Sequence, residues 1–403
     1  MILRFKKLTS FGFFIILIPF LHILGYQNFS IPMMFSGLAF TLFLVKKQIN
    51  LIFYSEDILL ISILIIGLFA QLINMDLMGI RYLSHLFFWY MSIFLFYFWS
   101  TAWIKKTGIS MEQLSIAFII SSIIASLGVI FDFLLVNFVG FYISDVIPYS
   151  IGEMEETKNL YNLFYRPRGF SAEPGFTSVV FEMLVPLAAV YLFKRSTTLF
   201  FIYIIIILFG YILLTSAASY LSLAIAFILF FLMIFNFKHK LYLLLFLSLT
   251  YFFFYNYINL YFLDVVVVKL LGVFEGDSDR LKIYLSLIEL SINKPFGIGF
   301  GALASAFFSD SSYAIFPIYG AGAISLYIEV LIASGLVGLL LFILFIFIKV
   351  YKAYYISNSL ESLAILFSLL LVLSHHIFIS EVTFPMFWVI LSLASSIKFL
   401  EKN

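Results

Sequence analysis

Two arginines and a glutamate stand close together in the segment 166–175, which reads Arg-Pro-Arg-Gly-Phe-Ser-Ala-Glu-Pro-Gly. A guanidinium group carries a permanent charge and a rigid fork of N–H donors that matches phosphate oxygens. Glu173, near Arg166 and Arg168, should stay ionised at neutral pH, so it could accept a proton from a hydroxyl group or hold an arginine in place. The prolines and glycines favour a turn-rich backbone. A helix-entry turn with a structural Arg–Glu pair is the alternative interpretation.

A further arginine, Arg280, follows Ser278 and Asp279 and precedes an apolar stretch that ends before Pro295. This pattern is typical of an N-capped helix, and its length and polarity suit a helix lying at a membrane interface. Arg280 would then sit at the positive end of the helix dipole, where both could face an anion. The alternative is a capping ion pair between Asp279 and Lys282.

Arg81 and His85 are four residues apart at the start of another apolar stretch, so on a helix they share one face. An interfacial anchor explains them as well as a binding site does. Asp132, Glu182 and Glu329 lie inside apolar stretches, where a charge is costly. The candidate catalytic residues are Arg166, Arg168, Glu173 and Arg280, and the candidate substrate-binding residues are Arg81, His85, Tyr165, Lys294 and Glu329.

The elements that must position these residues are membrane helices. The chain has 403 residues, of which 64% are hydrophobic and only 11% charged, whereas a soluble domain has about 25% charged residues. So few charges cannot cover a water-facing surface, which predicts one all-α polytopic membrane domain over residues 1–403. We expect about twelve transmembrane helices. They lie near 11–25, 31–45, 57–73, 83–103, 114–138, 175–193, 199–215, 219–235, 241–262, 322–348, 360–378 and 384–400.

Basic pairs such as Lys46/Lys47, Lys105/Lys106 and Lys349/Lys352 recur on every second connection between these stretches. The positive-inside rule assigns that side to the cytoplasm, together with both termini. The apolar run near the N-terminus has no small-x-small cleavage site after it, so we expect a retained helix. Two long loops, 139–174 and 263–321, fall on the outer side and are expected to carry short interfacial helices. Loops of such length are usually functional.

Arg81, Arg166, Arg168 and Arg280 all fall on the outer side, although the positive-inside rule opposes that placement. A pyrophosphate anchored in the outer leaflet would compensate for their charge. The alternative is pairing with acidic loop residues. Those residues are Asp145, Glu153, Glu155, Glu156, Glu275, Asp277 and Asp279.

Other residue types exclude several classes of chemistry. The chain has no Cys and a net charge of +2, which argues against thiolate chemistry and gives no reason to expect a nucleic-acid partner. His375 and His376 are adjacent, and on a helix they point about 100° apart, which is poor geometry for joint metal binding. Gly297, Gly299 and Gly301 follow no strand, so they predict a re-entry segment rather than a dinucleotide loop. We therefore predict no metal site and no cofactor.

Four segments together resemble the superfamily of O-antigen polymerases (Wzy-type) and O-antigen ligases, which are membrane glycosyltransferases. They are 166–175, the small-residue turn 214–219, Asp279-Arg280 with the run 293–301, and 325–338, in the family's order and spacing. The resemblance implies a GT-C-like fold, an undecaprenyl-diphosphate-linked glycan as substrate, and metal-independent transfer. By position it implies that Arg280 and either Arg166 or Arg168 are the family's diphosphate-binding arginines.

One departure separates the branches of the family. Ligases are similar to one another in having a His-Asn pair where this chain has Ile324 and Ser325, and no His lies within 263–321. The resemblance therefore implies a polymerase of O-antigen or related surface polysaccharide in the bacterial inner membrane, with the general base open and a chain-length regulator as a further partner. The alternatives are a ligase acting on lipid A core and a lipid-linked glycan flippase or transporter. A flippase would need basic residues throughout a central cavity.

Overall fold

The computed structural model describes residues 8–21, 30–74, 80–141, 143, 164–171, 173–214, 216–235, 287–300, 325–380 and 383–402, with the backbone alone at 80–85 and 217. Within these ranges the regular elements are helices and strands are absent, which confirms the all-α prediction there. The predicted span 241–262, and most of the two loops 139–174 and 263–321, lie outside the described residues.

The helices follow one another through short connections wherever consecutive elements are described. In chain order they are α1 (Ser10–Leu17), α2 (Ile31–Val45), α3 (Asp57–Ile73), α4 (Ile80–Ile93), η2 (Phe94–Trp99), α5 (Ser100–Thr107), α6 (Met111–Leu134), η3 (Leu135–Val139), α8 (Pro174–Arg195), α9 (Thr197–Leu214), α10 (Ala217–Ile234), α15 (Leu326–Ile356), α16 (Leu360–His375), α17 (Pro385–Ser395) and α18 (Ile397–Leu400). The η elements are π-helical, and a short helix also covers 287–293.

Each predicted span that the structure describes contains a helix, and several bounds agree to within a few residues. Within the described part of the chain, five helical stretches are long and apolar enough to cross a membrane. They are Leu86–Thr107, Met111–Val139, Pro174–Arg195, Thr197–Leu214 and Leu326–Ile356. The fold is thus consistent with a membrane-embedded helical protein, and the count of about twelve spans stays a prediction.

Side-chain caps explain where several helices begin. At α6, the Ser110 hydroxyl accepts from the Gln113 N–H at 3.3 Å, and the Gln113 side chain accepts from the Ser110 N–H at 3.1 Å. The same reciprocal arrangement joins Ser359 and Ser362 at α16. Such a capping box satisfies two backbone donors that the first turn leaves unpaired.

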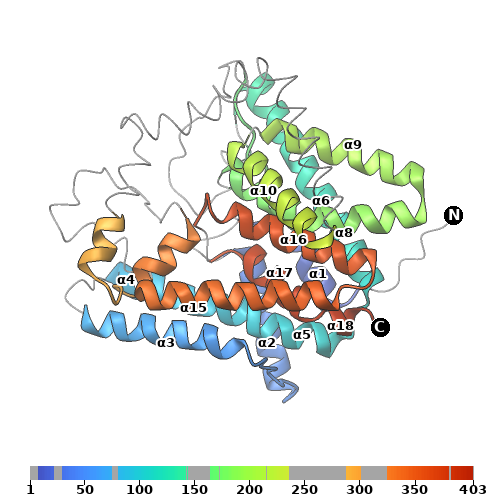
Figure 1. The fold of residues 1–403 in the computed structure, drawn as a ribbon. Coiled ribbons are helices and arrows are strands. Elements are labelled where there is room, and N and C mark those ends of the chain that lie inside the picture. Colours follow the sequence, from blue (N-terminus) through green and yellow to red (C-terminus); the bar gives the residue numbers. More distant parts are fainter. Residues whose placement is uncertain are drawn as a thin grey trace.

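Helix α8 is central to the bundle: it packs against α6, α9 and α16, while α16 also packs against α10 (Figure 1). Helix α15 runs mainly along α3. Small residues allow close approach between helices, as at Gly210 of α9, where a Cβ would collide with the Ser126 side chain of α6. Large aromatic side chains pack at η2 and α5, where the rings of Trp99 and Trp103 stack with 5.5 Å between their centroids.

Several contacts join helix ends that the basic pairs place on the same predicted side, and the sidedness itself stays a prediction. At the predicted inner ends, Lys194 pairs with Glu361 at 2.6 Å and Arg195 pairs with Glu112 at 3.0 Å. At the predicted outer ends, the Leu326 N–H donates to the carbonyl of His376 at 3.1 Å. Each of these contacts joins ends that the charge pattern places on the same side.

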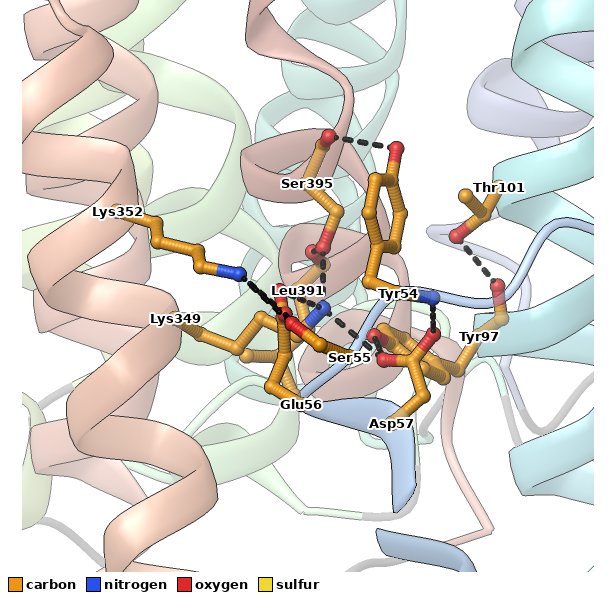
Figure 2. A network of polar contacts seen from close by, with 10 residues as sticks. All are labelled: Tyr54, Ser55, Glu56, Asp57, Tyr97, Thr101, Lys349, Lys352, Leu391 and Ser395. Atoms are coloured by element: carbon orange, nitrogen blue, oxygen red, sulfur yellow. Dashed lines mark hydrogen bonds and ion pairs between the residues drawn. The ribbon is translucent and has the colours of Figure 1, made fainter. Parts of the chain in front are cut away.

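One inner contact is buried rather than exposed. Lys349, on α15, is 2% exposed and pairs with Glu56 at 3.0 Å and with Asp57, at the start of α3, at 3.1 Å (Figure 2). Tyr97, from the π-helical η2, donates its hydroxyl to Asp57. Ser395 of α17 accepts from the Lys349 ammonium at 2.9 Å. This network therefore fixes the inner ends of α3, α15 and α17 against η2.

Candidate functional site

The arginine-bearing segment 164–171 is held by two polar side chains at the end of α6 and in η3. Asn137 pairs twice with Tyr165: its carbonyl oxygen accepts from the Tyr165 N–H at 2.8 Å, and its amide donates to the Tyr165 carbonyl at 3.0 Å. Both bonds use the backbone of Tyr165, so the Tyr165 side chain, which is half-buried, is positioned by a fixed main chain. The segment is therefore tethered just before its first arginine.

Asp132 holds the same segment just beyond that point. Its Oδ2 accepts from the N–H groups of Arg168 at 2.6 Å and Gly169 at 3.1 Å, and its Oδ1 accepts from the N–H of Ile143 at 3.0 Å. The carboxylate, 1% exposed, thus finds the donors that a charge buried in a membrane helix needs. Gly169 has φ +65°, where a side chain would be strained. Asp132 is therefore the anchor that sets the path of the arginine segment.

The two arginines differ in their surroundings. Arg166 is half-buried, and its Nε donates to the carbonyl of Leu214 at 3.3 Å, at the C-terminal end of α9. That end carries an excess of partial negative charge, which a guanidinium compensates. Arg168 is 4% exposed, and its charge lies within electrostatic reach of Asp132. Arg166 is thus the more accessible of the two.

Glu173 occupies the N-cap position of α8, and its side chain is exposed. Its backbone carbonyl accepts from the Ser171 hydroxyl at 2.9 Å, and Ser171 and Thr177 also donate to the carbonyl of Arg168. Among the described residues no ion pair of its carboxylate is found, and its relation to the two guanidinium groups stays a prediction. The carboxylate beside Arg168 is that of Asp132. A catalytic role of Glu173 stays a prediction.

A second group of the candidate residues surrounds a break in α15. The helix is interrupted at Gly335, which has φ 68° and ψ −174°. The N–H groups of Ile298 and Gly299 donate to the carbonyls of Ile332 at 2.8 Å and Ala333 at 2.9 Å, which the break leaves without helical partners. A Cβ at Gly335 would collide with the carbonyl oxygen of Pro295. The glycine-containing run 294–300 therefore packs into the interrupted helix.

The end of α3 fixes the other side of that run. Asn74 donates its amide to the Gly297 carbonyl at 3.2 Å, and Gln71 donates to the Phe300 carbonyl at 2.9 Å. Lys294 is exposed, and its ammonium donates to the Asn74 side chain at 3.0 Å. Lys294 thus stands at the outer edge of a tightly held turn, with part of its charge open to solvent.

Glu329, half-buried six residues before Gly335, connects this group to α4. Its carboxylate accepts from the Trp89 indole N–H at 3.1 Å and from the Ser380 hydroxyl. The Trp89 ring lies 4.5 Å from the ring of Phe300. Positions 81 and 85 fall two turns and one turn, respectively, before Trp89 along α4. The side chains of Arg81 and His85 lie outside the described atoms, so their relation to Glu329 stays a prediction.

The segment after α16 joins the two groups. Ser380 contacts Glu329, and the Thr383 carbonyl accepts from the Ser92 hydroxyl at 3.2 Å. The next residue, Phe384, meets Phe176 near the start of α8, with 5.1 Å between ring centroids. The starts of α8, α15 and α17 and the second half of α4 are thereby linked. Arg280 lies outside the described residues, so its relation to these groups is still a prediction.

The four motif segments pair in space although they are far apart in the sequence. Segment 166–175 meets the turn after α9 through Arg166 and Leu214, and 293–301 meets 325–338 through the bonds at Ile298 and Gly299. Tyr211 also holds the turn after α9, because its hydroxyl donates to the Ser219 carbonyl at 3.1 Å. The motifs therefore form two couples at the predicted outer ends of the helices.

Glu182 and His375 form a buried acid–base pair near the first couple, which was not predicted from the sequence. The Glu182 carboxylate meets His375 Nδ1 at 2.9 Å and accepts from the Ser222 hydroxyl at 2.6 Å and the Tyr211 hydroxyl at 3.4 Å. His376 instead bonds the Val372 carbonyl through Nδ1 at 2.7 Å, as its different direction on the helix requires. Glu182 and His375 are both ionisable residues in predicted spans, 175–193 and 360–378. Their positions near the predicted outer ends of these spans were the sequence signal that could have paired them.

Within the described ranges, no three His, Asp or Glu side chains converge as metal ligands would. The chemistry that these groups of residues offer is instead electrostatic: fixed cations, helix starts and oriented carboxylates. No known family, curated protein or solved structure matches the chain.

Proposed function

We propose that the chain is a membrane glycosyltransferase that polymerises undecaprenyl-diphosphate-linked oligosaccharide repeat units into O-antigen or a related surface polysaccharide. The observation that carries the proposal is the pairing of the four family-like segments into two couples, with Arg166 beside the turn at Leu214 in one and Lys294 beside the broken α15 in the other. Chance similarity of four short segments gives no reason for them to meet in pairs.

The proposed reaction needs stabilised negative charge more than it needs covalent chemistry. A sugar hydroxyl of a new unit attacks the anomeric carbon of the growing chain, the bond from that carbon to the diphosphate oxygen breaks, and the hydroxyl proton passes to a base. The leaving group is a diphosphate, so fixed cations lower the barrier. Arg166, Arg168 and Arg280 would hold the diphosphate, with Arg81 and Lys294 beside it.

The other candidate residues take supporting roles in this proposal. Glu173, exposed at the start of α8, is the proposed base or orienting group. An exposed carboxylate there can reach a hydroxyl of a sugar bound at the predicted outer ends of the helices. Tyr165, His85 and Glu329 would contact the glycan. The proposal includes a GT-C-like fold of about twelve spans in the bacterial inner membrane, both termini in the cytoplasm, and a chain-length regulator as a possible partner protein.

The buried position of Arg168 assigns it a distinct part. A guanidinium that is 4% exposed acts on a bound diphosphate through its charge, from the wall of the site, rather than through two open hydrogen bonds. Arg166 is half-buried and therefore more accessible to a bound diphosphate, and its Nε donates to the Leu214 carbonyl at 3.3 Å. Replacing arginine with lysine keeps the charge but removes the planar fork. This replacement should therefore lower activity more at Arg166 than at Arg168.

The phenotype of a deletion strain separates the proposal from its rivals. Glycan capped with single repeat units indicates a lost polymerase, free lipid-linked polymer indicates a lost ligase, and lipid-linked units trapped on the cytoplasmic side indicate a lost flippase. Complementation with Arg280→Ala should leave single units and no long chains. Lys106→Ala, an exposed lysine at the predicted inner end, is the matched control and should restore the full ladder.

A further inference from the structure

A hollow of about 590 Å³ opens at the predicted inner ends of the helices, far from the arginine segment. Ligand sites in proteins usually have volumes of about 300–1,000 Å³. Lysines from three parts of the chain line this hollow. They are Lys105 of α5, Lys349 and Lys352 of α15, Lys398 of α18 and Lys402 just after it.

The floor of the hollow is electrically balanced. The three ammonium protons of Lys349 are matched by Glu56 at 3.0 Å, Asp57 at 3.1 Å and Ser395 at 2.9 Å (Figure 2). Lys352 completes the balance through the second oxygen of Glu56. Two carboxylates therefore neutralise two lysines, so this quartet has no net charge.

The remaining lysines are not neutralised in this way. Lys105 has its ammonium 4.9 Å from the centre of the Tyr54 ring, and Lys398 and Lys402 are exposed. Among the described residues, no carboxylate lies within ion-pair distance of these three side chains. The hollow therefore presents about three positive charges above a neutral, rigid floor, which favours an anion.

The walls indicate which kind of anion fits. Besides the lysines, the hollow is lined by Tyr54, Tyr351, Tyr355 and Phe399 and by the aliphatic Ile356. Tyr54 and Ser395 are fixed by a bond from the Tyr54 hydroxyl to the Ser395 carbonyl at 2.9 Å. Lysine binds phosphate as a point charge, and aromatic side chains at the edge of a membrane pack against the apolar part of an amphiphile.

We propose that this hollow is a binding site for a phosphate-bearing ligand, held by Lys105, Lys398 and Lys402 over the quartet of Lys349, Lys352, Glu56 and Asp57. The site lies at the opposite end of the helices from the proposed transfer reaction and does not depend on it. A lipid headgroup and a soluble phosphate compound share the required chemistry, and the experiment below separates them.

The test uses the full chain, purified in a neutral detergent, and three sets of variants. Lys105→Gln, Lys398→Gln and Lys402→Gln together remove the unbalanced charges. Lys46→Gln, Lys47→Gln and Lys106→Gln together remove the same charge from exposed lysines at the same predicted end that do not line the hollow. In the third set, arginine replaces Lys105, Lys398 and Lys402 and keeps the charge. The melting temperature is measured as phosphatidylglycerol, phosphatidylcholine or pyrophosphate is titrated.

We expect a saturable rise in the melting temperature with phosphatidylglycerol, pyrophosphate or both, whose half-saturating concentration increases about tenfold in the Gln variant of the hollow. The arginine variant and the control lysine variant should behave as the wild type. Saturation by phosphatidylglycerol alone identifies a lipid headgroup, and saturation by pyrophosphate identifies a soluble ligand. An equal loss in both Gln variants, an equal effect of phosphatidylcholine, or no saturable effect of either anion overturns the proposal. If the triple Gln variant does not fold, Lys402→Gln alone decides, since this residue follows the last helix.

Discussion

The carboxylate of Asp132 accepts the backbone N–H of Arg168 at 2.6 Å, across 36 positions of sequence. A buried acid in the last turns of α6 thus determines where the arginine segment runs. The contact uses the main chain of Arg168, so the guanidinium is positioned without being consumed by that bond. This division between a residue that positions and residues that carry charge leads to the first prediction.

Asp132→Asn should remove chain growth although Asp132 itself need not touch substrate. An asparagine keeps the shape but turns one acceptor oxygen into a donor, which leaves either the N–H groups of Arg168 and Gly169 or the N–H group of Ile143 unpaired, at a cost of about 1–3 kcal/mol for each unpaired group. The melting temperature of the purified variant and the polysaccharide ladder of a complemented strain measure the two effects. Glu112→Gln removes the charge from the exposed pair with Arg195 but keeps an oxygen that can accept from the Tyr191 hydroxyl, so as the control it should change neither markedly. A variant of Asp132 with wild-type stability and ladder would contradict the anchoring role.

Gly335→Ala should destabilise the protein. The residue has φ 68°, and a Cβ there would collide with the Pro295 carbonyl, so alanine meets both backbone strain and a clash of about 1–3 kcal/mol or more. Gly175→Ala is the matched control, because a Cβ at Gly175 meets nothing within 4 Å. Melting temperatures of the two variants in detergent should differ clearly, with Gly175→Ala close to the wild type. Equal melting temperatures would show that the helix break does not require glycine.

The pair of Glu56 with Lys352 and Lys349 should be lost in acid. Burial raises the pKa of Glu56, but the hydrogen bond from Lys352 and the charge of Lys349 outweigh it and lower the pKa from 4.5 to about 2. A group with a lowered folded-state pKa stabilises the fold above its unfolded pKa, and this contribution disappears as the pH falls through the folded value.

The difference in melting temperature between wild type and Glu56→Gln should accordingly be constant above about pH 5 and shrink steadily towards pH 2. Other carboxylates titrate in both proteins and largely cancel in this difference. A gap that keeps its size down to pH 2, or that widens in acid, is incompatible with a lowered pKa at Glu56.

Glu182 and His375 should show strong energetic coupling. Each is almost completely buried and meets the other at 2.9 Å, so removing one partner leaves the other buried and unpaired. The single variants Glu182→Leu and His375→Leu should each lower the melting temperature. The sum of these two decreases should exceed the decrease in the double variant. Such a double-mutant cycle reports coupling directly. Additive effects of the two substitutions would mean that the contact contributes nothing of its own.

The helices could be predicted because their signal is local. A run of apolar residues with a basic pair near one end predicts the bounds of α3 and α8 to within a residue or two, and the prolines at the starts of α8 and α17 mark where a helix begins. The spans need only hydrophobicity and length, and both are properties of a short window of sequence.

The partners of the charged residues could not be predicted, because they depend on distances between helices. Lys349 read as one of many basic residues at a membrane edge, yet it is buried against Glu56 and Asp57, which precede it by almost 300 positions. Asp132 gave only the signal of an isolated acid in an apolar run, and its partners are backbone groups that every residue has. Glu173 lies near two arginines in the sequence, but the backbone N–H groups of Arg168 and Gly169 bond Asp132, which precedes them by more than 30 positions.

The central claim is that Arg166 and its neighbours hold a lipid diphosphate during chain growth. The direct measurement is chain elongation by the purified protein in liposomes supplied with undecaprenyl-diphosphate-linked repeat units, with the lengths of the products resolved. The account predicts a ladder of products and one free undecaprenyl diphosphate for each new linkage. It also predicts that Arg166→Ala abolishes the ladder and that Arg166→Lys restores it only in part, since lysine lacks the planar fork. A wild-type protein that forms no linkage from these units, or an Arg166→Ala protein that elongates at the wild-type rate, would contradict the account.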